Sequence, residues 1–185
     1  MNIIGETERL RLVVFEESHA EPAKLFWGDK EVMKLCGGSA SVETLPKTLE
    51  FYRHCHENNN LSVYAVMEKN TGEIIGAAGF NVENTIEEVE LIYHFNKKSW
   101  GKGYATEAVG ACMNIVKLHP KVKLVSASAS KENIGSLKIL ERVGFTYIGL
   151  RWFEDTQQEE PVYECRLIKE TISQEIIICF YGGIS

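Results

Sequence analysis

The stretch Tyr-His-Phe-Asn-Lys-Lys-Ser-Trp-Gly-Lys-Gly-Tyr-Ala-Thr-Glu, residues 93–107, decides the fold. An apolar run at 89–95 predicts a strand, and apolar residues at helical spacing predict a helix over 104–118. The loop between them contains Gly101 and Gly103, which lack a Cβ and let a ligand approach the backbone closely. N–H groups in the first turn of a helix have no intrahelical partner, and the helix dipole places partial positive charge there. The stretch therefore predicts a binding site for an anion such as a phosphate group.

Two common nucleotide motifs do not fit this loop. The P-loop requires Gly-x-x-x-x-Gly-Lys-Ser/Thr, and the loop has no such spacing. The Rossmann fingerprint requires a third glycine or alanine where this chain has Thr106. It also requires an acidic residue about 20 residues later, where Lys121 and Lys123 stand. A nucleotide-binding regulatory domain is therefore disfavoured.

The loop instead resembles the acyl-CoA pyrophosphate loop of the GNAT N-acetyltransferase superfamily, Gln/Arg-x-x-Gly-x-Gly/Ala, over residues 100–105. Trp100 in place of Gln/Arg is similar to the RimJ/RimL-type branch. A second stretch, 133–145, resembles the Asn-x-x-Ser and Leu-Glu-x-x-Gly-Phe wording of the same branch. Both motifs occur in the family order and at the family separation, and the resemblance covers about Thr7 to Ile168.

The resemblance implies the α/β GNAT fold. This fold is a mixed, mostly antiparallel twisted sheet of six to seven strands with helices on both faces, and its central strands splay where CoA enters. Hydropathy patterns and turn residues predict strands at 9–15, 61–68, 74–82, 87–95, 122–129, 146–153 and 161–167, and helices at 16–27, 30–36, 44–57, 104–118 and 133–144. Residues 1–170 are expected to form a single acetyltransferase domain.

The remaining residues, 171–185, form a C-terminal β-prone tail of unclear role. The run 176–181, Ile-Ile-Ile-Cys-Phe-Tyr, is uncharged and strongly β-prone. An exposed run of this kind is an aggregation hazard, so we expect it to be paired, buried or at an oligomer contact.

Bulk properties are those of an ordinary globular protein of 185 residues, with 44% apolar and 25% charged residues. No apolar run approaches the ~18–20 residues needed to cross a bilayer, and the N-terminus lacks a secretory pattern, so a cytoplasmic protein without a membrane partner is expected. Five widely spaced cysteines without Cys-x-x-Cys indicate free thiols and no metal site. A net charge of −6 argues against nucleic acid as a partner and is compatible with cationic amines.

The resemblance further implies acetyl-CoA as the co-substrate. Backbone N–H groups of 101–106 would bind its pyrophosphate, 93–95 would run beside the pantetheine arm, and Asn133 would contact CoA or a water near it. The expected CoA-binding residues are therefore Tyr93, His94, Phe95, Gly101, Lys102, Gly103, Tyr104, Ala105, Thr106 and Asn133.

Acetyl transfer requires the acceptor amine in its neutral form. A free lysine is neutral in about one molecule in 2,500 at pH 7, whereas an α-amino group is neutral in roughly 10–20%. A lysine acceptor therefore depends more strongly on a catalytic base to remove its proton. The expected catalytic residues are Glu90 as the base, Ser136 as the donor to the leaving thiolate, and Asn133 beside them. His94 is a second candidate base because the pKa of histidine lies in the useful range.

Two residues depart from the family pattern. Leu140 stands where many members have a tyrosine that donates a proton, so this tyrosine mechanism is not carried over. Ile92 stands where the family often has glycine. The sequence therefore does not decide whether the strand splays near Glu90.

The leading hypothesis is an N-acetyltransferase that moves an acetyl group to a primary amine by direct attack on the thioester. The acceptor would be a protein N-terminal α-amine or a small-molecule amine. The alternative, motivated by Ile92 and the absent tyrosine, is a catalytically weak acyl-CoA-binding sensor or scaffold module. A monomer or a homodimer is expected.

Overall fold

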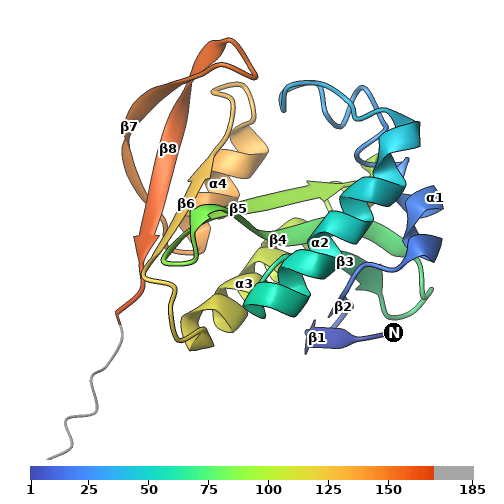
Figure 1. Cartoon of the computed structure of the whole chain (residues 1–185). Helices are drawn as coiled ribbons and strands as arrows, with labels where there is room; N and C mark the ends of the chain where they lie inside the picture. Colours follow the sequence, from blue (N-terminus) through green and yellow to red (C-terminus); the bar gives the residue numbers. More distant parts are fainter. Residues whose placement is uncertain (169–185) are drawn as a thin grey trace, which may run out of the picture.

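The computed structural model describes residues 1–168, which form one mixed α/β unit around an eight-stranded sheet (Figure 1). The strands are ordered β1-β2-β3-β4-β5-β6-β8-β7, and every neighbouring pair is antiparallel except β5 with β6. Their bounds are β1 Ile3–Glu6, β2 Leu10–Val13, β3 Val63–Glu68, β4 Ile74–Thr85, β5 Glu88–Phe95, β6 Leu124–Ser128, β7 Thr146–Phe153 and β8 Gln158–Arg166. The mostly antiparallel sheet is therefore confirmed.

The sheet has one strand more than the six to seven expected, because β1 pairs with β2 ahead of the first predicted strand. The helices are α1 Ala20–Ala23, α2 Leu45–Asn59, α3 Tyr104–Leu118 and α4 Ile134–Arg142, with short 3-10 turns at Glu17–His19, Val42–Thr44 and Lys97–Ser99. Helix α3 has the predicted bounds, since its apolar stripe is regular and Pro120 follows its end.

Two predicted helices near the N-terminus are wrong. The segment 16–27 contains only the turn Glu17–His19 and the four-residue α1, because Phe26 and Trp27 are buried side by side against the sheet instead of continuing a helix. The segment 30–36 forms turns. The Asp29 carboxylate caps the first turn by accepting hydrogen bonds from Glu31 N and Val32 N, but a segment this short that ends at Gly37, with φ +75°, does not continue as a regular helix.

Two hydrophobic cores cover the two faces of the sheet, as the fold requires. The face under α1 and α2 buries Phe15, Phe26 and Leu49, together with alternate residues of β3. The other face buries alternate residues of β2 and β5 against α3 and α4. Strands β1 and β7 are the two edges of the sheet and lie at opposite ends of the molecule (Figure 1).

The sheet opens in its middle. Strands β5 and β6 pair only over Glu88–Glu90 with Leu124–Ser126, although β5 continues to Phe95. Beyond Glu90 the β6-facing edge of β5 has no strand partner, while its other edge stays paired with β4 as far as Phe95. The splay is therefore present despite Ile92.

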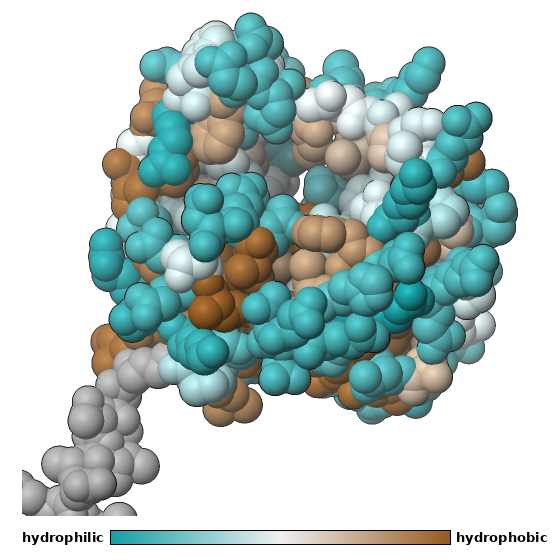
Figure 2. Space-filling view, in the orientation of Figure 1, coloured by the Kyte–Doolittle hydropathy of each residue, from teal (hydrophilic) through white to brown (hydrophobic). Residues whose placement is uncertain are grey.

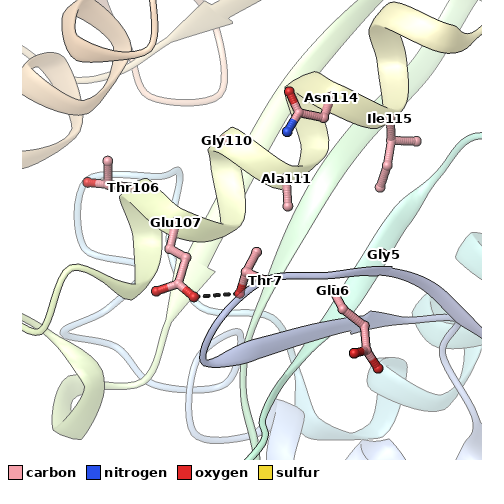
Figure 3. Close-up of a pocket in the computed structure, with 9 residues that line it drawn as sticks. All are labelled: Gly5, Glu6, Thr7, Thr106, Glu107, Gly110, Ala111, Asn114 and Ile115. Atoms are coloured by element: carbon pink, nitrogen blue, oxygen red, sulfur yellow. Dashed lines mark hydrogen bonds between the residues drawn. The ribbon is translucent and has the colours of Figure 1, made fainter.

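A partly buried ionic network ties the N-terminal segment to the start of α3, and Figure 3 shows its contact between Thr7 and Glu107. The Glu107 carboxylate accepts hydrogen bonds from the Thr7 hydroxyl, from the Arg9 backbone N–H at 2.9 Å and from Arg9 Nε at 2.7 Å. The same guanidinium donates to the Lys102 carbonyl at 2.9 Å and lies 4.6 Å above the Tyr104 ring. The network therefore fixes the backbone of the glycine loop.

We expect the Glu107→Gln variant to be less stable than the parent by roughly 1–3 kcal/mol at neutral pH. Burial alone would raise the pKa of Glu107, but the hydrogen bonds from Thr7 and Arg9 outweigh it and lower that pKa. A carboxyl with a depressed native pKa stabilises the fold above its unfolded pKa of about 4.3 and loses this contribution as the pH falls through the native value.

Urea denaturation of the parent and Glu107→Gln at neutral pH and at about pH 3 measures this cost. The difference in the free energy of unfolding should shrink at the lower pH. Glu43→Gln, an exposed carboxyl on a 3-10 turn, is the control and should change little. A cost of the same size at both pH values would contradict the ionic origin of the stabilisation.

We also expect Gly79→Ala to destabilise the sheet by roughly 1–3 kcal/mol or more. Gly79 has φ +152°, and a Cβ there would lie 2.3 Å from the Ser62 carbonyl oxygen, which is backbone and cannot rotate away. Gly110→Ala in α3 is the control, because a Cβ there meets nothing within 4 Å and alanine favours a helix by about 1 kcal/mol. Thermal and urea denaturation should shift in opposite directions for the two variants.

Candidate active site

A cleft of about 980 Å³ lies where β5 and β6 diverge. Figure 2 shows this face hollowed near its centre, beside the lobe formed by the β7–β8 hairpin. Nearly all of the predicted site residues line this one cleft: Glu90, Tyr93, His94, Phe95, Gly101, Gly103, Tyr104, Ala105, Thr106, Asn133 and Ser136. Lys102 does not line it, and its carbonyl instead accepts the hydrogen bond from Arg9.

The glycine loop presents an uncapped helix end to this cleft. Gly101 and Gly103 have φ of +73° and +80°, and Gly103 is the N-cap of α3 with no side-chain cap. On the strand side, Asn96 Oδ1 accepts hydrogen bonds from the backbone N–H and hydroxyl of Ser99, and Trp100 Nε1 donates to the Phe95 carbonyl at 2.8 Å. The first-turn N–H groups are therefore held in place and left free for an anion.

Helix α4 begins at the same cleft. The Asn133 side chain accepts a hydrogen bond from Ser136 N at 3.1 Å, which confirms the predicted cap. The Tyr93 hydroxyl reaches across from β5 and lies 2.6 Å from Ser136 Oγ and 3.2 Å from the Ser136 carbonyl oxygen. Leu140, where the family often has tyrosine, is fully buried and faces the core.

Successive side chains of β5 point to opposite faces of the sheet, as in any strand. Tyr93 points to the face with α4, where it meets Ser136. Ile92 and His94 point to the face with α1 and α2, where Ile92 packs in the second core and His94 meets Trp27. Glu90 lies on the same face as Ile92 and His94. The candidate base Glu90 and the candidate donor Ser136 therefore approach the notch between β5 and β6 from opposite sides of β5.

Glu90 sits in an acidic environment. Burial raises its pKa above the ordinary value, a hydrogen bond from Asn81 Nδ2 at 3.4 Å lowers it, and the nearby carboxylates of Glu83, Asp155 and Glu160 raise it further. The net effect is a raised pKa. Glu90 therefore holds a proton more readily than an exposed glutamate, which suits a group that must accept one.

His94 is poorly placed to act as the base. Burial lowers its pKa to about 4, so the ring is neutral at pH 7. Its Nδ1 accepts a hydrogen bond from Trp27 Nε1 at 3.2 Å, which leaves the proton of the neutral ring on Nε2. The only lone pair that could take a proton is therefore already engaged, and the geometry argues against the hypothesis that His94 is a second base.

Sequence analysis missed several residues of this cleft, namely Cys36, Asp155, Thr156 and Glu160. Glu160 is only 4% exposed, and Thr156 Oγ1 is buried without a hydrogen-bond partner. A Cβ on Gly37 would lie 3.6 Å from the Asp155 carbonyl, so the segments around 36 and 155 meet over the cleft. The acidic residues of the β7–β8 turn were the available signal in the sequence. Sequence alone does not show that this turn lies beside the cleft.

Two features are absent from residues 1–168. No group of histidine, cysteine, aspartate or glutamate side chains there is arranged to hold a metal ion. In the same residues, no helix combines the length and apolar character that crossing a bilayer requires.

Comparison with known proteins identifies the family. The family described as acetyltransferase (GNAT) domain matches residues 9–146. An uncharacterized N-acetyltransferase, p20 of Bacillus licheniformis, is 27% identical over 147 residues, which cover 78% of this chain and 83% of the relative.

Solved structures agree on the fold. A GNAT-family acetyltransferase from Bacillus anthracis superposes with a TM-score of 0.77 at 22% identity and covers 90% of this chain and 98% of its own. RimL, a ribosomal L7/L12 α-N-protein acetyltransferase solved in complex with coenzyme A, superposes with a TM-score of 0.71 at 18% identity and covers 90% and 98%. The chain belongs to the GNAT family of N-acetyltransferases, in its RimJ/RimL-type branch.

Proposed function

We propose that this enzyme transfers the acetyl group of acetyl-CoA to a primary amine by direct attack of the amine on the thioester. The observation that carries the proposal is the notch between β5 and β6. The notch opens into one cleft that holds both the glycine loop and Glu90. The coenzyme A bound to RimL, which shares the fold, supports the same assignment.

On the donor side, the free N–H groups of residues 101–106 suit the pyrophosphate of acetyl-CoA. The unpaired edge of β5 beyond Glu90 offers N–H and C=O groups at the spacing of a strand. The pantetheine arm contains two amides and can hydrogen-bond there as a neighbouring strand would. The thioester would then lie near Asn133 and Ser136, at the start of α4.

On the acceptor side, the carboxylates of Glu90, Asp155 and Glu160 form no ion pair with any residue in 1–168. They favour an acceptor that arrives as an ammonium ion. Glu90, directly or through water, then takes the proton of the amine. The neutral amine then attacks the thioester carbon, its nitrogen releases a second proton to water as the N–C bond forms, and the C–S bond breaks so that CoA leaves as a thiolate hydrogen-bonded by Ser136.

The acceptor class follows from this chemistry and from the neighbours. A protein N-terminal α-amine suits a base as weak as a carboxylate, because a sizeable fraction of such amines is neutral at pH 7. RimL acts on a protein N-terminus, which supports this class. A small-molecule amine is the other candidate.

Thiol release from acetyl-CoA across a panel of peptides with free N-termini and small amines tests the proposal. Peptides with acetylated N-termini are the matched controls. Saturable binding of acetyl-CoA without thiol release from any amine would support the alternative of a catalytically weak acyl-CoA sensor, which Leu140 motivates. Absence of acetyl-CoA binding would contradict both readings.

We expect Gly101→Ala to weaken acetyl-CoA binding about tenfold. Both Gly101 and Gly72 have φ +73° with nothing within 4 Å of a built Cβ, so alanine imposes the same backbone strain at either position. Relief of this strain at 101 would rotate the N–H groups that bind the pyrophosphate, whereas Gly72 lies in the β3–β4 turn. Calorimetric titration should show weaker binding in Gly101→Ala and unchanged binding in Gly72→Ala.

We expect Glu90→Gln to lower kcat by about 10²-fold or more, since a general base contributes 10²–10⁴-fold. In the parent, kcat/KM should rise with pH through the raised pKa of Glu90, because only the carboxylate accepts a proton. The variant should lose this limb while its affinity for acetyl-CoA stays unchanged. Glu88→Gln, on the exposed end of the same strand, is the control, and an equal loss there would contradict a role specific to Glu90.

A further inference from the structure

The proposed function uses only the backbone of Tyr93, beside the pantetheine arm of CoA. The Tyr93 hydroxyl, however, makes the shortest polar contact with Ser136. The ring packs against the main core, and the hydroxyl reaches the first turn of α4 at 2.6 Å from Ser136 Oγ. Both residues line the cleft. The contact joins β5 to the helix that carries the candidate donor, on the face opposite Glu90.

The two hydroxyls share two protons, and their arrangement decides whether Ser136 can act as a donor. In one arrangement Ser136 donates to Tyr93, and Tyr93 donates to the Ser136 carbonyl oxygen 3.2 Å away. The Ser136 proton is then used inside the pair. In the other, Tyr93 donates to Ser136 Oγ, and the Ser136 proton is free to point into the cleft.

We propose that Tyr93 is a positioning residue that donates to Ser136 Oγ and so directs the Ser136 proton at the sulfur of CoA. The inference rests on the proposed function and names the device that assists departure of the thiolate. The tyrosine in this proposal is on β5. The position in α4 where many family members have a tyrosine holds Leu140, which is buried in the core.

The surroundings of Tyr93 suit a permanent donor. Burial raises its pKa to about 12, although the hydrogen bond with Ser136 acts in the opposite direction. Tyr93 therefore keeps its proton through the pH range in which an alkyl thiol such as that of CoA ionises. The pair supplies a hydrogen bond to the sulfur and no net proton. The thiolate takes its proton from water after the C–S bond breaks.

The test measures the pKa of the CoA thiol bound to the protein, so it does not depend on the identity of the acceptor. A donor to the thiolate favours the charged form and lowers the thiol pKa. Ultraviolet absorbance of the thiolate is titrated with pH for the CoA complex, and the same titration with desulfo-CoA subtracts the protein cysteines. The proteins are the parent, Tyr93→Phe, Ser136→Ala and the double variant.

We expect the bound thiol to ionise at a lower pH than free CoA in the parent, and about one pH unit higher in Tyr93→Phe than in the parent, a tenfold change in the thiolate ratio. Ser136→Ala should give a similar shift, and the double variant no further shift, because Tyr93 acts only through Ser136. With an acceptor from the panel, Tyr93→Phe should lower kcat about tenfold and leave KM for acetyl-CoA unchanged.

Tyr163→Phe is the matched control. Its hydroxyl also bonds to α4, at 3.3 Å from Glu141 Oε1, but Tyr163 does not line the cleft. An equal shift in this control, an unchanged thiol pKa in Tyr93→Phe, or additive shifts in the double variant would each overturn the assignment. If Tyr93→Phe fails to fold, the thiol pKa in Ser136→Ala decides. An unchanged thiol pKa in Ser136→Ala would then overturn the assignment. Loss of CoA binding in the parent would instead overturn the proposed function.

Discussion

The divergence of β5 from β6 after Glu90 is the constraint on which the site depends. Within a sheet, backbone N–H and C=O groups bond to the next strand, and a buried edge without a partner is costly. Here the edge over residues 91–95 is left open in the middle of an eight-stranded sheet. Such an edge is tolerated where water or a peptide-like ligand takes the place of a strand. The pantetheine arm of CoA, which contains two amides, is a ligand of that kind and is the one proposed to occupy this edge.

An open edge is useful only if the phosphate loop beside it keeps a fixed position. Arg9 supplies this, since it pairs with Glu107 in the first turn of α3 and also holds the Lys102 carbonyl. On the other side of the loop, Trp100 is bonded to the end of β5. Arg9 and Trp100 therefore hold the loop at both ends, and the N–H groups of residues 101–106 need no rearrangement before an anion binds.

The sheet, α3, the glycine loop and the cap of α4 could be predicted because local rules decide them. The period of the apolar residues sets α3, and Asn133 caps α4 by a bond three residues along the chain. The segments 16–36 and 154–160 could not be predicted, because long-range packing decides them. Trp27 is held by rings from α2 and by His94, and the segment around Gly37 meets Asp155. Residues of these segments line the cleft on the side proposed for the acceptor, so the acceptor is the part of the function that sequence leaves open.

The register between β4 and β5 decides which chemistry lies on which side of the notch. Gly79 pairs with Ile92 in this register, and the backbone of β4 passes so close to Ser62 that a side chain at 79 does not fit. Because side chains alternate with a period of two, a shift by one residue would bring Glu90 to the α4 face and Tyr93 to the α1–α2 face. Glu90 would then face Ser136 on α4, and Tyr93 would lose its contact with Ser136. The β4–β5 register therefore keeps Glu90 and Tyr93 on opposite faces of the strand, which is the separation that the proposed roles require.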